Sequence, residues 1–423
     1  MQCPRAGDQD QVLRNPDPHI APLLLVRICA RWRHIALATP MLWTEMQLIL
    51  ANSNWLDGKG VPWKLVLMNN WVVNASPLPI SFAARCDSYE VLTRALSVTN
   101  RFKALHLRLS AQSIRALRGR IPRTRLDAES LQIDIADSAF REPHLYSSFK
   151  NSASLRSFTL ISATPGVQSA LLQFSLPWAQ LTHMSIDEPL FFASMTVLVQ
   201  CINLVNCTFG TLAPFDDEDD VALQGENTLP FLTDANFTFD DLDWVTAEHF
   251  LKPLILPTLK KLVLKVAYPP VQWSATAFSH FQMRSAFNLE MLELDMLIAT
   301  EDLRGLLGSL PSLKNFTSTQ ISDAVALFSL LTFNGPNGLL PQLECLKFNF
   351  IQSDISLEAF IAMIRSRRKR LRAPAPGTLM SRLEHLHIIS AKGTLPLDRW
   401  WWPLKLELVF PKLELEFECT GTL

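Results

Sequence analysis

The sequence predicts an α/β fold in which short parallel strands alternate with helices along a repeating array. Leucine makes up 70 of the 423 residues, which is typical of repeats or of helices. A motif of the form apolar-x-x-apolar-x-apolar recurs eleven times along the chain. Hydrophobic residues make up 48% and charged residues 19%, so the disordered and fibrous classes are excluded.

The motif recurs at a nearly regular spacing. Its copies begin at residues 102, 128, 155, 181, 204, 232, 259, 289, 313, 343 and 383, and the copy at 313 is incomplete. The steps run from 23 to 30 residues, with a last step of 40, and most lie at or near the roughly 20–29 residues of a leucine-rich repeat. Each unit exposes an apolar face that only a neighbour can cover, so we expect an irregular leucine-rich-repeat solenoid, or horseshoe. The alternative is a globular α/β protein with parallel strands.

The first elements precede the first copy of the motif. Residues 43–50 read as a strand, residues 63–73 as a helix and residues 78–82 as a second short strand. The last two apolar positions of each motif alternate with the period of a strand that has one buried face. Helical spacing follows at residues 89–96 and 355–364, and a proline often ends the helix before the next motif.

The C-terminal residues predict a closed end to the array. Residues 404–410 and 412–418 alternate cleanly and read as the last strands. An edge strand needs cover to avoid pairing with other chains, and we expect Trp400, Trp401 and Trp402 to form an apolar cap.

Composition also bears on the compartment. The net charge of −1 favours neither nucleic acid nor anionic lipid as a partner. Seven scattered cysteines without a CxxC pair argue against a zinc knuckle and a secreted disulfide framework. Residues 189–215 carry no charge, but their polar residues favour a buried helix followed by a buried strand over a membrane span. We expect a soluble intracellular protein, cytoplasmic or nuclear or both, with a membrane-associated protein as the alternative.

Under the repeat hypothesis, the residues between the apolar positions of each strand point to a concave face. Solenoids use such a face for extended contacts with a partner. We expect it to bind a protein through His106, Arg108, Asp134, His183, Asp187, Asp234, Lys261, Lys265, Glu293, Asp295, Lys347, His385 and His387.

Signatures of catalysis are missing from the sequence. Neither a nucleophile elbow, a phosphate-binding loop, a dinucleotide fingerprint nor a zinc-protease motif occurs, so we expect no enzyme activity and no cofactor. His385 and His387 have a spacing that suits a metal, but without a third ligand we expect two solvated imidazoles. The acidic run 216–220 reads as an exposed loop. The basic run 365–372 closes a helix whose dipole it complements, and we expect it to be accessible; the alternative is a nuclear-localisation or anion-binding patch.

Residues 23–43, LLLVRICARWRHIALATPMLW, carry the most specific pattern in the chain. Their apolar residues fall on one stripe of a helix that Thr39-Pro40 ends. The order I-C-x-x-W-R-x-I-A-x-x-T-P-x-L-W resembles the second half of the F-box in the large fungal, basidiomycete-type F-box/leucine-rich-repeat family. Residues 71–80, where a Trp-bearing helix leads into a Pro-Leu strand, resemble the same family. Residues 1–22 hold no counterpart of the Leu-Pro-x-Glu stretch that opens such an F-box, so we expect only its second half.

The resemblance implies a substrate-recognition subunit of a cullin–RING (SCF-type) ubiquitin ligase, a monomer within that complex. It implies a disordered N-terminus at 1–22, a partial F-box helix at 23–42 and a repeat solenoid with a C-terminal cap at 43–423. The family's F-box binds a Skp-type adaptor, and an unknown protein substrate would occupy the concave face. The positions that match for adaptor binding are Leu24, Leu25, Ile28, Trp32, Ile35 and Pro40. For Trp32, core packing and adaptor contact are both open. The alternative is a non-catalytic binding scaffold that no longer engages the adaptor.

Overall fold

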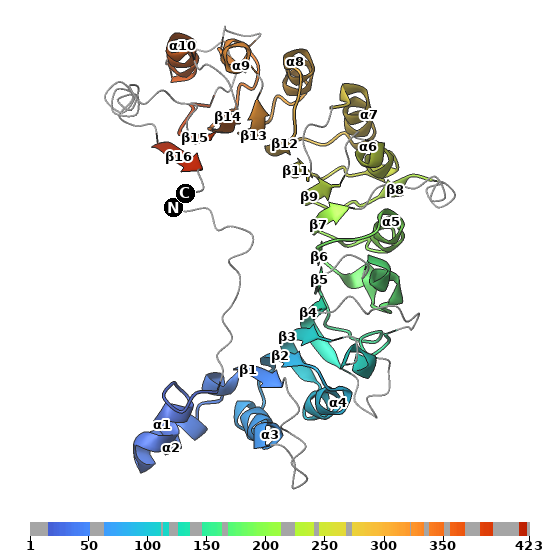
Figure 1. The fold of residues 1–423 in the computed structure, drawn as a ribbon, viewed down its shortest axis with the longest axis vertical. Helices are drawn as coiled ribbons and strands as arrows, with labels where there is room; N and C mark the ends of the chain where they lie inside the picture. Colours follow the sequence, from blue (N-terminus) through green and yellow to red (C-terminus); the bar gives the residue numbers. More distant parts are fainter. Residues whose placement is uncertain are drawn as a thin grey trace. The chain divides into compact units, whose positions relative to one another are not determined.

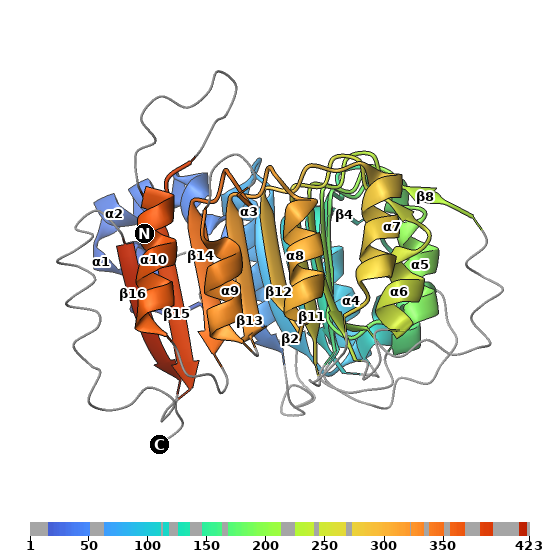
Figure 2. The ribbon, with the colours of Figure 1, turned by 90° about the horizontal axis from the view of Figure 1, so that it is seen from above.

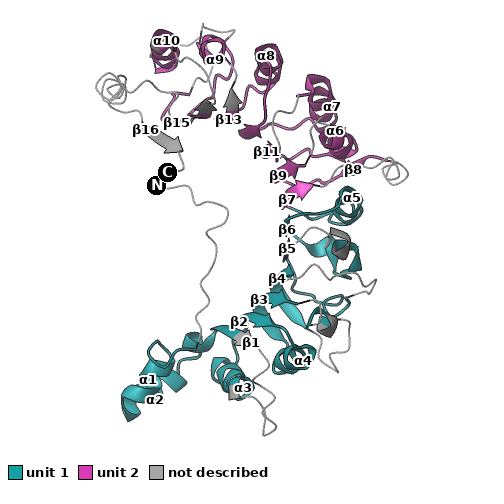
Figure 3. Ribbon diagram, in the orientation of Figure 1, with its two compact units in different colours: residues 1–204 teal, residues 205–423 magenta. Residues whose placement is uncertain are grey.

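Every copy of the apolar motif leads into one β-strand of the computed structural model, and neighbouring strands run parallel. The structure describes residues 16–50, 63–110, 113–117, 126–135, 146–162, 168–212, 225–240, 245–267, 273–321, 323–333, 338–350, 356–368, 381–391 and 414–420. The chain divides into two units, residues 1–204 and residues 205–423, which are described separately below (Figure 3). The α/β fold class is therefore confirmed.

In unit 1, each strand pairs with the strand that follows it in the chain, in the order β1-β2-β3-β4-β5-β6. The strands are β1 (Glu45–Leu50), β2 (Ile80–Cys86), β3 (Arg101–Leu109), β4 (Asp127–Ile135), β5 (Ser157–Ser162) and β6 (His183–Ile186). The α-helices are α1 (Leu23–Ile28), α2 (Ala30–Leu37), α3 (Trp63–Ala75), α4 (Tyr89–Ser97) and α5 (Phe191–Leu198). The 3-10 helices are η1 (Pro40–Trp43), η3 (Ser113–Leu117), η4 (Gln168–Gln173) and η5 (Trp178–Gln180). The helix predicted at 63–73 is confirmed. The strand predicted at 43–50 begins only at residue 45, because Trp43 ends η1, and the strand predicted at 78–82 lies at 80–86.

Unit 2 repeats the same arrangement, with parallel strands in the order β7-β9-β11-β12-β13-β14-β15-β16. They are β7 (Asn206–Leu212), β9 (Asp234–Phe239), β11 (Lys261–Val266), β12 (Met291–Asp295), β13 (Asn315–Ile321), β14 (Cys345–Phe350), β15 (His385–Ala391) and β16 (Glu414–Thr420). The helices are α6 (Val245–Leu251), α7 (Ala275–Ser285), α8 (Thr300–Gly308), α9 (Ala324–Leu331) and α10 (Leu357–Arg368). Two short strands, β8 (Asn227–Thr228) and β10 (Leu254–Ile255), form a separate parallel pair.

Within each unit the helices that follow the strands lie on one face of the sheet, and the described residues leave the other face uncovered (Figure 1). In unit 2, α8, α9 and α10 lie side by side in front of their strands (Figure 2). The motif positions form the core between the two layers: Leu155, Phe158 and Leu160 are at most 4% exposed, and the other copies behave alike. Burying such side chains stabilises the fold by about 1.5–3 kcal/mol each.

We call the side of each sheet that the described helices leave uncovered the open face.

A short turn precedes several strands of unit 2. The sequence Leu-Pro-x-Leu occurs before β9, β11, β13 and β14, and in each copy the second leucine N–H donates to the carbonyl of the first at 3.2–3.4 Å. Proline presets this turn. The expectation that a proline ends the preceding helix fits Pro311, three residues after α8, but not Pro257 and Pro341, because α6 and α9 end six and ten residues before them. The two N–H groups that follow the turn share one acceptor, the residue just before the preceding strand. At β13, for example, Lys314 and Asn315 both donate to the carbonyl of Glu290 at 2.9 Å.

Some expectations are corrected or lie outside the described residues. The charge-free run holds α5 and then β7, and no helix within the described ranges is long and apolar enough to cross a membrane. The single helix expected over 23–42 is wrong, because Cys29 is extended (φ −160°, ψ 171°) and separates α1 from α2. At this break, Arg33 Nε donates a hydrogen bond to the carbonyl of Val26 at 2.8 Å. The expected strand 404–410, the cap at Trp400–Trp402 and the acidic loop 216–220 lie outside the described residues.

Candidate functional site

The first candidate surface lies on α1 and α2. Four apolar side chains expected to contact an adaptor are exposed: Leu24 by 39%, Ile28 by 54%, Trp32 by 45% and Ile35 by 40%. Leu25 and Pro40 are half-buried. Core packing for Trp32 is therefore wrong, since nearly half of its surface is free in a side chain that usually buries most of its area. Exposed apolar side chains on neighbouring helices favour an interaction surface. We call Leu24, Ile28, Trp32 and Ile35 the α1–α2 patch.

Two buried tryptophans hold this region to the sheet. Trp43, at the end of η1, is 3% exposed and donates its indole N–H to the carbonyl of Ala36 at 2.8 Å. Its ring meets that of Trp71 on α3 edge to face, with centroids 4.9 Å apart. Trp43 and Trp71 thus fasten α2 and η1 to the first strand–helix unit. The patch therefore sits on a packed support rather than on a free helix.

The second candidate surface is the open face of unit 1. His106, Arg108, Asp134, His183 and Asp187 all lie on this face and are exposed or half-buried, as the strand alternation predicted. Register places Arg108 beside Asp134, and Arg108 Nε lies 3.5 Å from Asp134 Oδ2. His106 lies beside Gln132, whose amide is 3.1 Å from the ring Nε2. His183 makes a local contact of 2.8 Å with the Thr182 hydroxyl.

Asp187 differs from its neighbours because no cation of unit 1 is paired with it among the described residues. Its backbone N–H donates to the carbonyl of Leu160, which fixes it at the end of β6. Partial burial and the negative charge of Asp134 raise the pKa of the Asp187 carboxyl above its ordinary value. The raised pKa indicates a carboxylate that would gain from a cationic partner.

The third candidate surface is the open face of unit 2, where several charges are already paired across strands. Lys265 Nζ lies 2.8 Å from Glu293 Oε1, and His385 Nδ1 lies 2.8 Å from Glu414 Oε2. Asp295 accepts a hydrogen bond from the Thr319 hydroxyl. The remaining expected residues also lie on exposed or half-buried strand positions: Asp234, Lys261, Lys347 and His387, of which Lys347 and His387 are register neighbours.

The sequence did not identify the partners of these charges. Glu414 lies in the run 412–418 that was expected to form a last strand, but its pairing with His385 was not predicted, and Thr319 was not singled out at all. The sequence also did not predict an ion-pair network just before strands β11, β12 and β13. In it, Glu290 Oε2 lies 2.8 Å from Lys314 Nζ and Glu290 Oε1 lies 3.6 Å from Lys260 Nζ. The hydrogen bond from Lys314 lowers the pKa of Glu290. Aligning the motif copies by their step would place Lys260, Glu290 and Lys314 at one position of three consecutive copies.

The structure also bears on the metal site that the sequence left open. Within the described ranges, no group of three His, Cys, Asp or Glu residues could hold a metal ion. His385 and His387 share a strand face as expected, but His385 pairs with Glu414 instead of being solvated alone. The expectation of an accessible basic run is wrong for Arg367, which is 2% exposed, while Arg365 is exposed and residues 369–372 lie outside the described part.

No family model matches this chain, and no curated protein matches it.

Proposed function

We propose that this chain is the substrate-recognition subunit of a cullin–RING (SCF-type) ubiquitin ligase, built as an irregular leucine-rich-repeat solenoid behind a partial F-box. Three features support the repeat assignment. Eleven motif copies lead into parallel strands in chain order, the Leu-Pro-x-Leu turn recurs, and the helices of each unit share one face. Such arrays stack units that bury each other's apolar faces.

The observation that carries the ligase assignment is the α1–α2 patch. Its four side chains occupy positions that match the F-box pattern, and each is 39–54% exposed on short helices anchored by Trp43. A Skp-type adaptor would bury them, since large apolar and aromatic side chains are the usual energetic centres of interfaces. Leu25 and Pro40, which are half-buried, would hold the helices rather than contact the adaptor.

The open faces would bind the protein to be ubiquitinated. Their strand residues alternate charges and amides over several neighbouring strands, and the described helices leave them uncovered. This chain would contribute no reacting group and no cofactor. Catalysis would come from holding the target near the other subunits, which is an effect of proximity. The ligase would act in the cytoplasm, the nucleus or both.

The test is co-purification of the full chain with a recombinant Skp-type adaptor. We expect the parent to retain the adaptor and the double variant Ile28→Ala, Trp32→Ala to retain at least tenfold less, since hot-spot side chains contribute on the order of 2 kcal/mol each. Met283→Ala is the matched control, because Met283 is 70% exposed on α7 of unit 2. Circular dichroism should be the same for all three proteins.

Failure of a folded parent to retain the adaptor would overturn the ligase assignment. It would leave the alternative, a non-catalytic protein-binding scaffold whose open faces act without the adaptor. Retention by the parent and equally by the double variant would place the adaptor elsewhere and would remove the role of the α1–α2 patch.

A further inference from the structure

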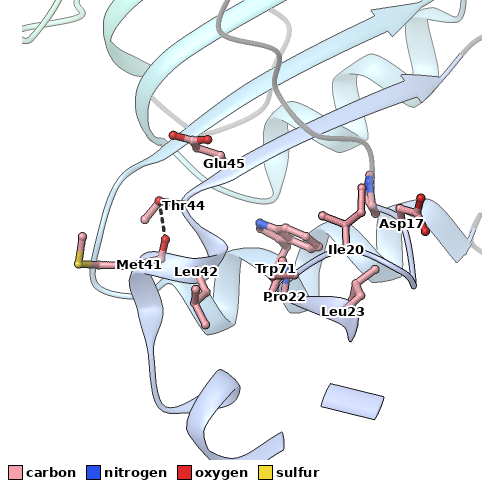
Figure 4. Close-up of a pocket in the computed structure, with 11 residues that line it drawn as sticks. Asp17, Ile20, Pro22, Leu23, Met41, Leu42, Thr44, Glu45 and Trp71 are labelled. Atoms are coloured by element: carbon pink, nitrogen blue, oxygen red, sulfur yellow. Dashed lines mark hydrogen bonds between the residues drawn. The ribbon is translucent and has the colours of Figure 1, made fainter. Parts of the chain in front are cut away.

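A small pocket lies beside the first residues of β1, outside the α1–α2 patch. Its volume is about 260 Å³, which suits one or two side chains better than a drug-sized molecule. Polar and apolar groups share its wall, and the apolar side chains include those of Ile20, Pro22, Leu23, Leu42 and Trp71 (Figure 4). Ile20 is 40% exposed, so the wall includes a side chain that gains from being covered.

One residue of the pocket lining carries a hydrogen-bond donor that is not used. Trp71 is 3% exposed, and its indole Nε1 is buried without a partner among the described residues. A buried donor of this kind costs about 1–3 kcal/mol and calls for an explanation. The neighbouring Trp43 has its donor satisfied by Ala36. Figure 4 shows the Trp71 nitrogen directed toward the side of the pocket between Thr44 and Ile20; because this nitrogen is buried, an acceptor reaches it only when the lining moves.

The charges around the pocket favour a cationic occupant. Asp17 and Glu45 lie on opposite sides of the lining, and the residues of the lining include no Lys, Arg or His (Figure 4). The Asp17 carboxylate already accepts a hydrogen bond from the His19 N–H at 2.7 Å. A Lys or Arg side chain would place its apolar stem against Leu42 and Ile20 while its charged end reached a carboxylate.

The backbone of β1 favours an extended peptide over a free amine. Ser81 donates its N–H to the carbonyl of Thr44 at 2.7 Å. This bond shows which residues of β1 direct their backbone groups toward β2. In a parallel pair, alternate residues bond to alternate sides, so the N–H and C=O groups of Glu45 and Gln47 face away from β2. Within the described part of the chain no backbone group pairs with them. An open edge of this kind accepts an added strand.

We propose that this edge and pocket bind an extended peptide segment of another protein in which basic and apolar residues alternate. Main-chain hydrogen bonds to Gln47 extend the sheet of unit 1, a peptide carbonyl accepts from Trp71 Nε1, and a basic side chain pairs with Glu45 or Asp17. The partner is thus a protein with an exposed basic and apolar strand-forming segment. The inference does not depend on adaptor binding.

The test uses fluorescence polarisation of a labelled, end-capped pentapeptide of alternating arginine and leucine, added to the full chain. We expect saturable binding that Gln47→Pro weakens at least tenfold, because proline removes the outward N–H. Gln47→Ala is the matched control and should bind as the parent does, since it keeps the N–H. Trp71→Phe should weaken binding about tenfold and Glu45→Gln a few-fold, whereas Glu358→Gln on α10 should change nothing.

Circular dichroism of each variant separates loss of binding from loss of fold, and Trp71→Phe decides the matter if Gln47→Pro does not fold. Equal binding of a pentapeptide of alternating glutamate and leucine would overturn the proposal. So would unchanged binding by both folded Gln47→Pro and Trp71→Phe, or competition by arginine amide as effective as competition by the peptide. Binding that arises only after residues 1–15 are deleted would make this chain its own occupant and would also overturn it.

Discussion

At the residue scale, unit 2 depends on a buried guanidinium that the sequence suggested was accessible. Arg367 on α10 donates to three carbonyls: Leu331 at 2.7 Å, Leu340 at 2.8 Å and Leu339 at 2.7 Å. Leu331 ends α9, and Leu339 and Leu340 lie at the turn before β14. Burial lowers the pKa of Arg367 to about 10, so the side chain is still charged at neutral pH. One fork-shaped cation therefore joins a helix end, a turn and the next helix.

Replacing Arg367 should destabilise the protein more than any change on the exposed side of the same helix. Arg367→Met removes the guanidinium donor from the carbonyls of Leu331 and Leu339 and leaves the Leu340 carbonyl with only the Leu343 N–H, and we expect a loss of about 3 kcal/mol in the free energy of unfolding. Arg367→Lys should recover only part of it, because an ammonium cannot reproduce the planar fork. Urea denaturation followed by circular dichroism measures both. The control is Arg365→Met, because Arg365 is exposed and its replacement should change the free energy of unfolding by less than about 0.5 kcal/mol. Equal losses in the two variants would show that the three hydrogen bonds of Arg367 do not stabilise the fold.

The raised pKa of Asp187 gives a second prediction at this scale. Because its folded pKa lies above the unfolded one, the stability associated with Asp187 is complete below the unfolded pKa and is lost as pH rises through the folded pKa. Asp187→Asn should therefore stabilise the fold slightly at pH 7, by a few tenths of a kcal/mol for a group that is partly solvated, and have no effect near pH 3. Asp134→Asn should lower the pKa of Asp187 in an NMR titration.

The matched control for that titration is Glu129→Gln. Glu129 lies on the same strand as Asp134, β4, and is exposed, so the net charge changes equally while the nearby charge stays. A charge several residues farther away is largely screened at physiological salt. An equal fall of the Asp187 pKa in both variants would show that total charge, rather than the Asp134 neighbour, is the cause.

At the element scale, the sequence predicted strands better than it predicted helices. A strand follows directly from the motif because two apolar residues at period two must face one core, and Leu105, Leu107 and their counterparts in other copies are buried accordingly. The outward positions between them follow from the same alternation. The open-face residues, from His106 to His387, could therefore be placed on one side of each sheet from the sequence alone.

The break at Cys29 could not be read from the sequence, since neither glycine nor proline is present to mark it. The backbone there is extended, and the bond from Arg33 to the Val26 carbonyl offsets the lost helical hydrogen bond. The sequence also did not show which arginine of the basic run is buried. Arg365 and Arg367 are two residues apart, yet Arg365 is exposed and Arg367 is buried. Partners such as Glu414 and Thr319 depend on register between copies, which a variable step of 23–40 residues does not fix.

At the scale of the whole molecule, the sequential order of parallel strands decides how stability is distributed. In each unit a strand pairs only with its predecessor and its successor in the motif series. A linear array of this kind has a stability close to a sum of local terms and nearest-neighbour interfaces. A globular α/β protein, the alternative that the sequence left open, would instead unfold as one cooperative body.

These two descriptions predict different responses to a cavity in β14. Leu346 is fully buried, and Leu346→Ala should cost about 2–5 kcal/mol locally. In a linear array, hydrogen–deuterium exchange should accelerate most in β13, β14 and β15, and little in β9 and β11 of the same unit. Lys347→Ala, one residue along and on the open face, is the control and should leave exchange unchanged. Uniform acceleration across unit 2 would instead indicate a single cooperative core, and the repeat assignment on which the proposed function rests would have to be abandoned.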